Sequence, residues 1–150
     1  MAGDSWDWRS DRSLPVGIRN NNPGNLKQTT PRQGWLGAAD ETPDPPFESF
    51  VSYRYGLRAA IKLLRNKANG GLNTPRKLIN MWAPVSDNSE ASTTNYINAV
   101  ASSLGTNADQ PFNPNDKEAV YKIVAAIEEW ENDVTVINEE EFNAAWELQA

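Results

Sequence analysis

The chain has 150 residues, 39% of them hydrophobic, which suits one domain with one hydrophobic core. Its formal net charge is −6 and it has no run of Lys or Arg, so binding of nucleic acid through a basic surface is not expected. It has no Cys and no His, which excludes disulfides, the common zinc sites, cysteine nucleophiles and His-based triads. Acid–base chemistry near neutral pH would then fall to Asp, Glu, Tyr or Lys, and we expect no metal and no cofactor.

Membrane association is not expected either. No apolar stretch approaches the ~20 residues that a membrane span needs. No hydrophobic segment of a signal peptide opens the chain. If the protein acts outside a cytoplasm, we therefore expect something else to carry it there.

The first segment, residues 1–15, is polar, alternates in charge and has no helical or strand periodicity. It predicts a flexible N-terminal arm in front of a domain that spans residues 16–150. Trp6 and Trp8 are unusual in such a segment. They could pack back on the domain or anchor the arm in a partner protein.

Residues 17–26 read Gly-Ile-Arg-Asn-Asn-Asn-Pro-Gly-Asn-Leu and predict a loop shaped by its own hydrogen bonds. Neutral amides bind sugar hydroxyls and an indole ring packs on a sugar face, so this loop and a nearby tryptophan are candidate sugar-binding groups. The candidates are Asn20, Asn21, Asn22, Asn25 and Trp35. The alternative is a structural turn whose asparagines only satisfy backbone groups. Arg19 could bind a peptide carboxylate or pair with a surface acid.

Some short β-structure is predicted in the turn-rich stretch 28–55. Residues 47–53 alternate between apolar and polar side chains, which is the pattern of a half-buried strand.

Helices are predicted for the rest of the chain. A helix through Leu57 and Leu64 should stop at Gly70, and the next should open with Thr74 as its N-cap. A third should close at Gly105. The fourth is predicted over residues 114–131, with Val120, Val124 and Ile127 on its buried face, and a last amphipathic segment over residues 139–148.

Cleavage of a glycosidic bond needs a carboxylic acid whose pKa is raised by apolar surroundings, often with a second carboxylate nearby. Glu131 lies four positions after Ile127 and seven after Val124, on the apolar stripe of its predicted helix. Glu129 points the opposite way and Glu128 lies on the flank. A solvated or capping glutamate at a helix end is the alternative interpretation of Glu131.

Several separate blocks of the sequence resemble, in the same order, a family of phage virion-associated and endolysin-like proteins. The blocks are GIRNNNPGNL, WLG, FESF, YGLRAAIKLL, MWAPVSDN and NYINAVASSLG, and the likeness runs from about Gly17 to the C-terminus. Proteins of that family carry a lysozyme-like domain that cleaves peptidoglycan. The resemblance therefore implies a mainly α (α+β) domain, lysozyme-like with a small β-hairpin, and peptidoglycan as the partner.

The resemblance also implies roles for particular acids. The segment IVAAIEEWEN matches a family helix that ends in an acid and an Asn, which makes Glu131 the candidate general acid. Asp44 stands three residues before the first Phe of FESF, where the family has an acid, and is the candidate second carboxylate, with Glu41 as another acid to test. The family has Gly after Glu-Asn, whereas this chain has Asp133. Because the asparagine loop precedes the glutamate, we infer a circularly permuted form of the lysozyme arrangement.

The main hypothesis is cleavage of the peptidoglycan glycan strand, as a muramidase or a lytic transglycosylase, by a phage protein. It would act from the virion or from the host cytoplasm on the cell wall, with the arm available to contact other virion proteins. The alternative is a non-enzymatic virion or tail protein that retains the fold as a docking or glycan-binding module.

Overall fold

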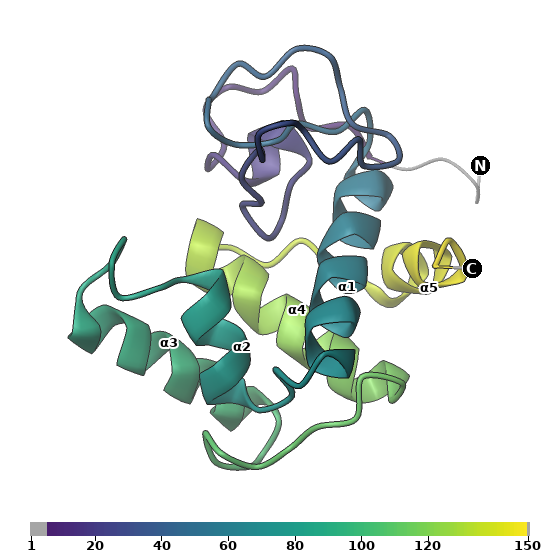
Figure 1. Cartoon of the computed structure of the whole chain (residues 1–150). Helices are drawn as coiled ribbons and strands as arrows, with labels where there is room; N and C mark the ends of the chain where they lie inside the picture. The colour runs from purple at the N-terminus through teal and green to yellow at the C-terminus, as the bar shows by residue number, and fades with distance from the viewer. Residues whose placement is uncertain (1–5, 150) are drawn as a thin grey trace.

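The computed structural model describes residues 6–149, and its fold is mainly helical, as predicted. Within these residues a short 3-10 turn, η1 (Ile18–Asn20), precedes five α-helices. These are α1 (Tyr53–Asn69), α2 (Pro75–Trp82), α3 (Glu90–Ser103), α4 (Lys117–Asn132) and α5 (Glu139–Glu147). The loops before α1 lie together above the helices, and α1 descends from them into the helical part (Figure 1). None of the helices described is long and apolar enough to cross a membrane.

Most predicted helix boundaries are confirmed by the capping groups. α1 is followed by Gly70, and Thr74 caps α2 by accepting a hydrogen bond from the backbone N–H of Lys77 at 3.2 Å. Ser89 caps α3 in the same way, and Asn138 caps α5. Each cap satisfies a backbone donor that has no partner inside the helix.

The predicted start of the fourth helix is wrong by three residues. α4 begins at Lys117, because Asp116 serves as the N-cap and accepts from the backbone N–H groups of the first turn. The side chain of Asn113 instead accepts from the N–H of Asn115 within a turn. The buried face is confirmed, since Val120, Val124 and Ile127 are all buried.

The sequence places Glu128 on the flank of α4, and this prediction is wrong. The residue is fully buried. Its carboxylate accepts hydrogen bonds from the Tyr53 hydroxyl and from the backbone N–H groups of Val136 and Ile137. Helical geometry alone misplaced it, because the chain after α4 folds back and covers that side of the helix.

The predicted strand over residues 47–53 is reduced to two isolated antiparallel bridges, Lys27 with Phe47 and Ala38 with Phe50. Turns interrupt the neighbouring segments after a few residues, so no ladder develops, and α1 already begins at Tyr53. Burial does not follow the alternation either, because the polar Glu48 is buried and the apolar Val51 is 42% exposed.

Two groups of apolar side chains hold the structure together. The main core lies among the helices and includes Leu57, Leu78, Val100, Val120 and Phe142. A smaller cluster of Leu26, Phe50 and Ala59 joins the loops to α1. Burying one such large apolar side chain contributes about 1.5–3 kcal/mol. At Gly56 a Cβ would lie 1.5 Å from the carbonyl oxygen of Asn21, so only glycine lets the loop approach α1 this closely.

Residues 6–14, the described part of the expected arm, lie against the domain. The carbonyl oxygen of Trp6 accepts from the N–H of Tyr53 at 2.7 Å, and the N–H of Trp8 donates to Oδ1 of Asn21 at 2.9 Å. Both indole rings pack on the main core. The rest of the arm, residues 1–5, lies outside the described residues, and the division at residue 15 stays a prediction.

Candidate active site

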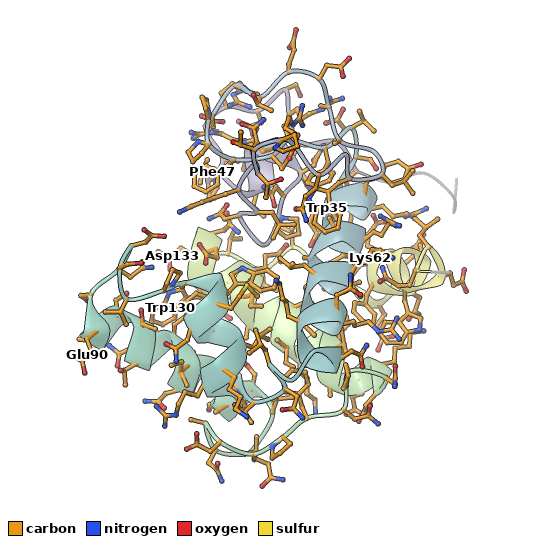
Figure 2. The ribbon with its side chains drawn as sticks, viewed as in Figure 1. Trp35, Phe47, Lys62, Glu90, Trp130 and Asp133 are labelled. Carbon is orange, nitrogen blue, oxygen red and sulfur yellow. The ribbon has the colours of Figure 1, made fainter. Side chains whose placement is uncertain are left out.

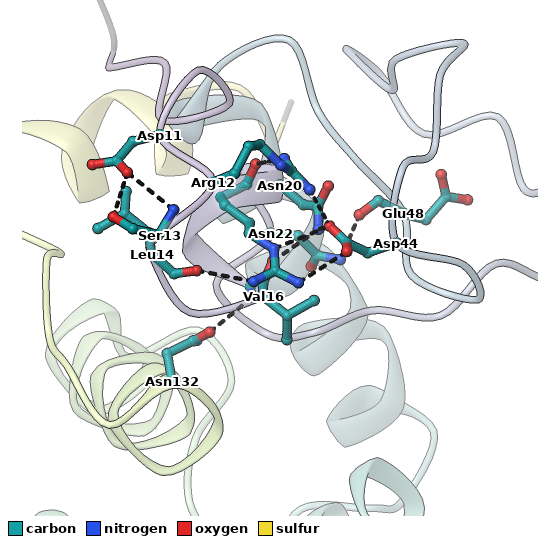
Figure 3. Close-up of polar contacts among 12 residues, drawn as sticks. Asp11, Arg12, Ser13, Leu14, Val16, Asn20, Asn22, Asp44, Glu48 and Asn132 are labelled. Atoms are coloured by element: carbon teal, nitrogen blue, oxygen red, sulfur yellow. Dashed lines mark hydrogen bonds and ion pairs between the residues drawn. The ribbon is translucent and has the colours of Figure 1, made fainter.

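Asn132, the last residue of α4, ties the asparagine loop to the helices. Its Oδ1 accepts from the backbone N–H of Gly17 at 2.9 Å (Figure 3). Its Nδ2 donates to the carbonyl oxygens of Pro23 and Glu128. A Cβ at Gly17 would lie 2.3 Å from that Oδ1. The sequence therefore places glycine where the loop and the end of α4 meet.

Three of the four candidate sugar-binding asparagines are buried. Asn20, Asn21 and Asn22 are each at most 1% exposed. Asn21 donates to the carbonyl oxygen of Phe50, and Asn22 donates to that of Glu48 and accepts from the N–H of Leu26. These amides pair with backbone groups of the loop, which would be costly to bury without a partner.

Asn25 is the asparagine of this loop that reaches the predicted acid. Its Nδ2 donates to Oε1 of Glu131 at 3.0 Å, and the Tyr96 hydroxyl of α3 donates to Oε2 at 3.0 Å. The carboxyl group thus lies where the loop, α3 and the end of α4 converge. Asn25 adopts a left-handed backbone conformation, with φ at 51°, which Asn tolerates better than most residues.

The surroundings of Glu131 favour its protonated form. Burial raises the pKa of its carboxyl group above the ordinary value of 4.5, and this effect outweighs the hydrogen bonds from Asn25 and Tyr96 and the charge of Lys27, which lower it. Burial also raises the pKa of the Tyr96 hydroxyl, so the hydroxyl keeps its proton. A partly buried acid of this kind is what proton donation to a leaving group requires.

A groove of about 220 Å³ lies beside Asn25, lined also by Leu26, Lys27, Leu63, Met81, Trp82, Pro84 and Asp87. The indole N–H of Trp82 donates to the carbonyl oxygen of Gly24 at 2.9 Å, which fixes the ring against the loop. Two of the lining residues form an ion pair, with Nζ of Lys27 3.6 Å from Oδ2 of Asp87. Apolar walls with a few polar groups are typical of ligand sites.

Asp44, the candidate second carboxylate, lies in an ion-pair cluster on the loops. It pairs with Arg12 and, at 2.9 Å, with Arg19, and it accepts from Nδ2 of Asn20 at 2.9 Å (Figure 3). The hydrogen bonds from Arg19, Asn20 and Arg12 hold the pKa of Asp44 well below its usual range. Arg19 therefore pairs with an acid, the second of the two alternatives open for it.

Two other candidates, Glu41 and Trp35, are not among the residues that contact the Glu131 carboxyl group. Glu41 is exposed and lines a hollow with Asp7 and Arg9. Trp35 is half-buried and packs on the small cluster that joins the loops to α1 (Figure 2). The structure thus brings Glu131 together with Asn25, and places Asp44, Glu41 and Trp35 in other surroundings.

Sequence reasoning had not assigned Asn132 or Tyr96 to the site. The Tyr96 hydroxyl contacts Glu131, a role that no motif in the sequence indicates. The signal for Asn132 was its place directly after Glu131, because a side chain at the end of a helix can bind a neighbouring loop.

Comparison with known proteins finds a relative among phage proteins. The chain is 36% identical over 121 residues to protein P5 of Pseudoalteromonas phage PM2, an alignment that covers 79% of this chain and 74% of the relative. No protein-family model matches the chain. The name of the relative states no activity, so it indicates a phage protein and nothing finer. The chain belongs to the phage protein family that includes protein P5 of phage PM2.

Proposed function

We propose that this member of the P5 family cleaves the glycan strand of peptidoglycan, with Glu131 as the general acid. The observation that carries the proposal is the setting of the Glu131 carboxyl group, which is partly buried at the end of α4 and held by Asn25 and Tyr96. One of these two partners, Asn25, also lines a groove. Burial raises the pKa of this carboxyl group, which is the direction of shift that a proton donor needs. The resemblance of six sequence blocks to peptidoglycan-cleaving phage proteins supplies the substrate.

In the proposed reaction, protonated Glu131 gives its proton to the glycosidic oxygen as the bond from that oxygen to the sugar carbon breaks. Asn25 and Tyr96 act as positioning residues that fix the carboxyl group. The sugar carbon is then attacked by water, which gives hydrolysis, or by a hydroxyl group of the same sugar, which gives an anhydro product. In either case the Glu131 carboxylate takes up the proton that the attacking O–H group loses, which regenerates the acid.

We assign Asp44 a structural role in this reaction. Both of its oxygens are engaged by Arg12, Arg19 and Asn20. Removing it from these partners to act on a sugar would cost several charge-assisted hydrogen bonds. The proposal therefore rests on one acid, Glu131, and this favours attack by the sugar's own hydroxyl group, which needs no second carboxylate.

A second candidate is a non-enzymatic protein of the phage particle. The relationship to protein P5 supports this candidate more directly than it supports cleavage, since a phage protein is all that it indicates. The contacts of Glu131 also favour the non-enzymatic role. Each of its carboxylate oxygens accepts a hydrogen bond from a different segment, so the residue can hold the loop and α3 together without any catalytic function. The N-terminal segment would then be available to contact other virion proteins.

The two candidates make opposite predictions for purified peptidoglycan. We would incubate the purified protein with sacculi and follow both the loss of turbidity and the release of soluble glycan fragments. Cleavage predicts release of fragments, and mass analysis of their ends separates hydrolysed from anhydro products. Unchanged sacculi over a range of pH would favour the structural role.

A further inference from the structure

Trp130 has an exposed aromatic surface close to Glu131 and lies outside the proposed catalytic group. Its ring stacks on Tyr96, with the ring centroids 5.0 Å apart and the planes at 23°. The residue is nevertheless 40% exposed, which is unusual for tryptophan. Because Tyr96 covers one face of the ring, the exposed area comes from the other face and the edges.

This ring borders a hollow of about 470 Å³ along the seam between α3 and α4, lined by Ala99, Ser103, Ala126, Glu129, Trp130 and Asp133. Its volume lies within the ~300–1,000 Å³ that is usual for small-molecule sites. Three of the lining side chains, those of Ala99, Ser103 and Ala126, are small. Trp130 and Asp133 lie next to each other at the upper end of α4 in Figure 2.

The polar groups of the described lining are all suited to hydroxyl groups. Glu129 and Asp133 are exposed carboxylates, which only accept hydrogen bonds, and Ser103 can donate or accept. No Lys or Arg is among these lining residues, so the hollow does not complement an anion. A flat apolar ring beside hydroxyl acceptors complements a neutral sugar, which offers C–H groups on its face and O–H groups at its edge.

From this arrangement we infer that the Trp130 hollow is a second glycan subsite, which holds a neutral sugar of the strand that Glu131 cleaves. The inference rests on the proposed function for the identity of the strand. Tyr96 connects the two places physically: its ring supports Trp130, and its hydroxyl binds Glu131. Since Ala99 and Ser103 follow Tyr96 by one and two helical turns, the hollow leads away from the acid along α3.

The test uses the indole N–H signals of the six tryptophans in an NMR titration. The sample is the Glu131→Gln protein, so that strands stay intact, and the probe is peptide-free glycan strands purified from peptidoglycan. Trp130→Phe in the same background assigns the Trp130 signal while keeping an aromatic ring on Tyr96. We expect the Trp130 signal to move on titration and the signal of Trp6 to stay in place.

Substitutions give the second readout. Trp130→Ala should weaken binding of the strands about 3- to 10-fold, the size of one aromatic stacking contact, and Asp133→Asn should weaken it less. Asn tolerates the left-handed backbone of residue 133, where φ is 61°, so this variant tests the carboxylate without straining the chain. Val134→Ala is the matched control: it removes a 37% exposed apolar side chain close by and should leave affinity unchanged.

Three results would overturn the inference. The Trp130 signal could stay in place while strands bind elsewhere, strands could fail to bind, or the signal could move with protein concentration alone, which would show a second copy of the chain in the hollow. Failure of the proposed function gives a different pattern. In that case Glu131→Gln cleaves sacculi as well as the unmodified protein does, or neither cleaves, whereas the titration still reports on Trp130.

Discussion

Asn25 and Glu131 are 106 positions apart in the sequence, and Nδ2 of Asn25 donates to Oε1 of Glu131 at 3.0 Å. This contact joins the N-terminal loop to the end of α4. Asn132, the next residue, makes two further hydrogen bonds across the same junction, to Gly17 and Pro23. The candidate site therefore exists only when both ends of the chain are folded together.

The Asn132 contacts predict a loss of stability on substitution. Asn132→Ala leaves buried partners unsatisfied, among them the N–H of Gly17, and should lower the free energy of unfolding by about 1–3 kcal/mol. Denaturant unfolding measures the effect. Asn66→Ala, at an exposed position of α1, is the control and should be neutral or slightly stabilising. Equal stabilities for the two variants would show that Asn132 does not hold the loop.

The ion pairs of Asp44 predict that substitution of this residue lowers the free energy of unfolding by an amount that depends on pH. Because ion pairing lowers the folded-state pKa of Asp44, its contribution to stability is present above its unfolded value of about 3.8 and is lost as pH falls through the lower, folded value. Asp44→Asn should therefore cost about 1–2 kcal/mol at pH 7 and almost nothing at strongly acidic pH. Urea unfolding at several pH values tests this, with the exposed Glu41→Gln as control. A cost that does not depend on pH would contradict it.

The raised pKa of Glu131 predicts the opposite dependence of stability on pH. Its folded-state pKa lies above the unfolded value of 4.5, so the folded protein binds its proton more tightly, and stability falls as pH rises from 4.5 through the folded value. Glu131→Gln removes this loss, because an amide can accept from Asn25 and donate to the Tyr96 hydroxyl. The melting temperature of the variant, relative to the unmodified protein, should rise between pH 4 and pH 8. A difference that is constant over this range would refute the assignment, and the exposed Glu147→Gln should show such a constant, small difference.

Tyr96 should act on Glu131 through its hydroxyl group. Tyr96→Phe removes a hydrogen bond that lowers the pKa of Glu131 and keeps the ring that stacks on Trp130. The pKa of the acid should rise further, so the alkaline limb of the cleavage profile should shift to higher pH. Rates measured on sacculi over a pH series test this. Tyr121→Phe, on the far part of α4, should leave the profile unchanged, and an unshifted profile for Tyr96→Phe would mean that the hydroxyl does not influence the acid.

The sequence predicted the helices well and the site in part, for physical reasons. Helix-end signals such as Thr74 and Gly70 are local, so they could be recognised without a structure. The position of Glu131 followed from the periodicity of α4, but its contact with Tyr96 depends on how α3 packs, which no local pattern encodes. The burial of Asn21 could not be predicted either, because it depends on a distant glycine, Gly56, that lets α1 approach.

The central claim, that Glu131 is the general acid of glycan cleavage, is tested most directly by the release of glycan fragments from purified sacculi by Glu131→Gln. The variant keeps the shape and the hydrogen bonds of the side chain and loses only the proton donor. We predict that the rate falls by ~10²–10⁴-fold while the fold is retained, and that Glu147→Gln cleaves at the rate of the unmodified protein. Release of fragments by Glu131→Gln at an undiminished rate would contradict the account.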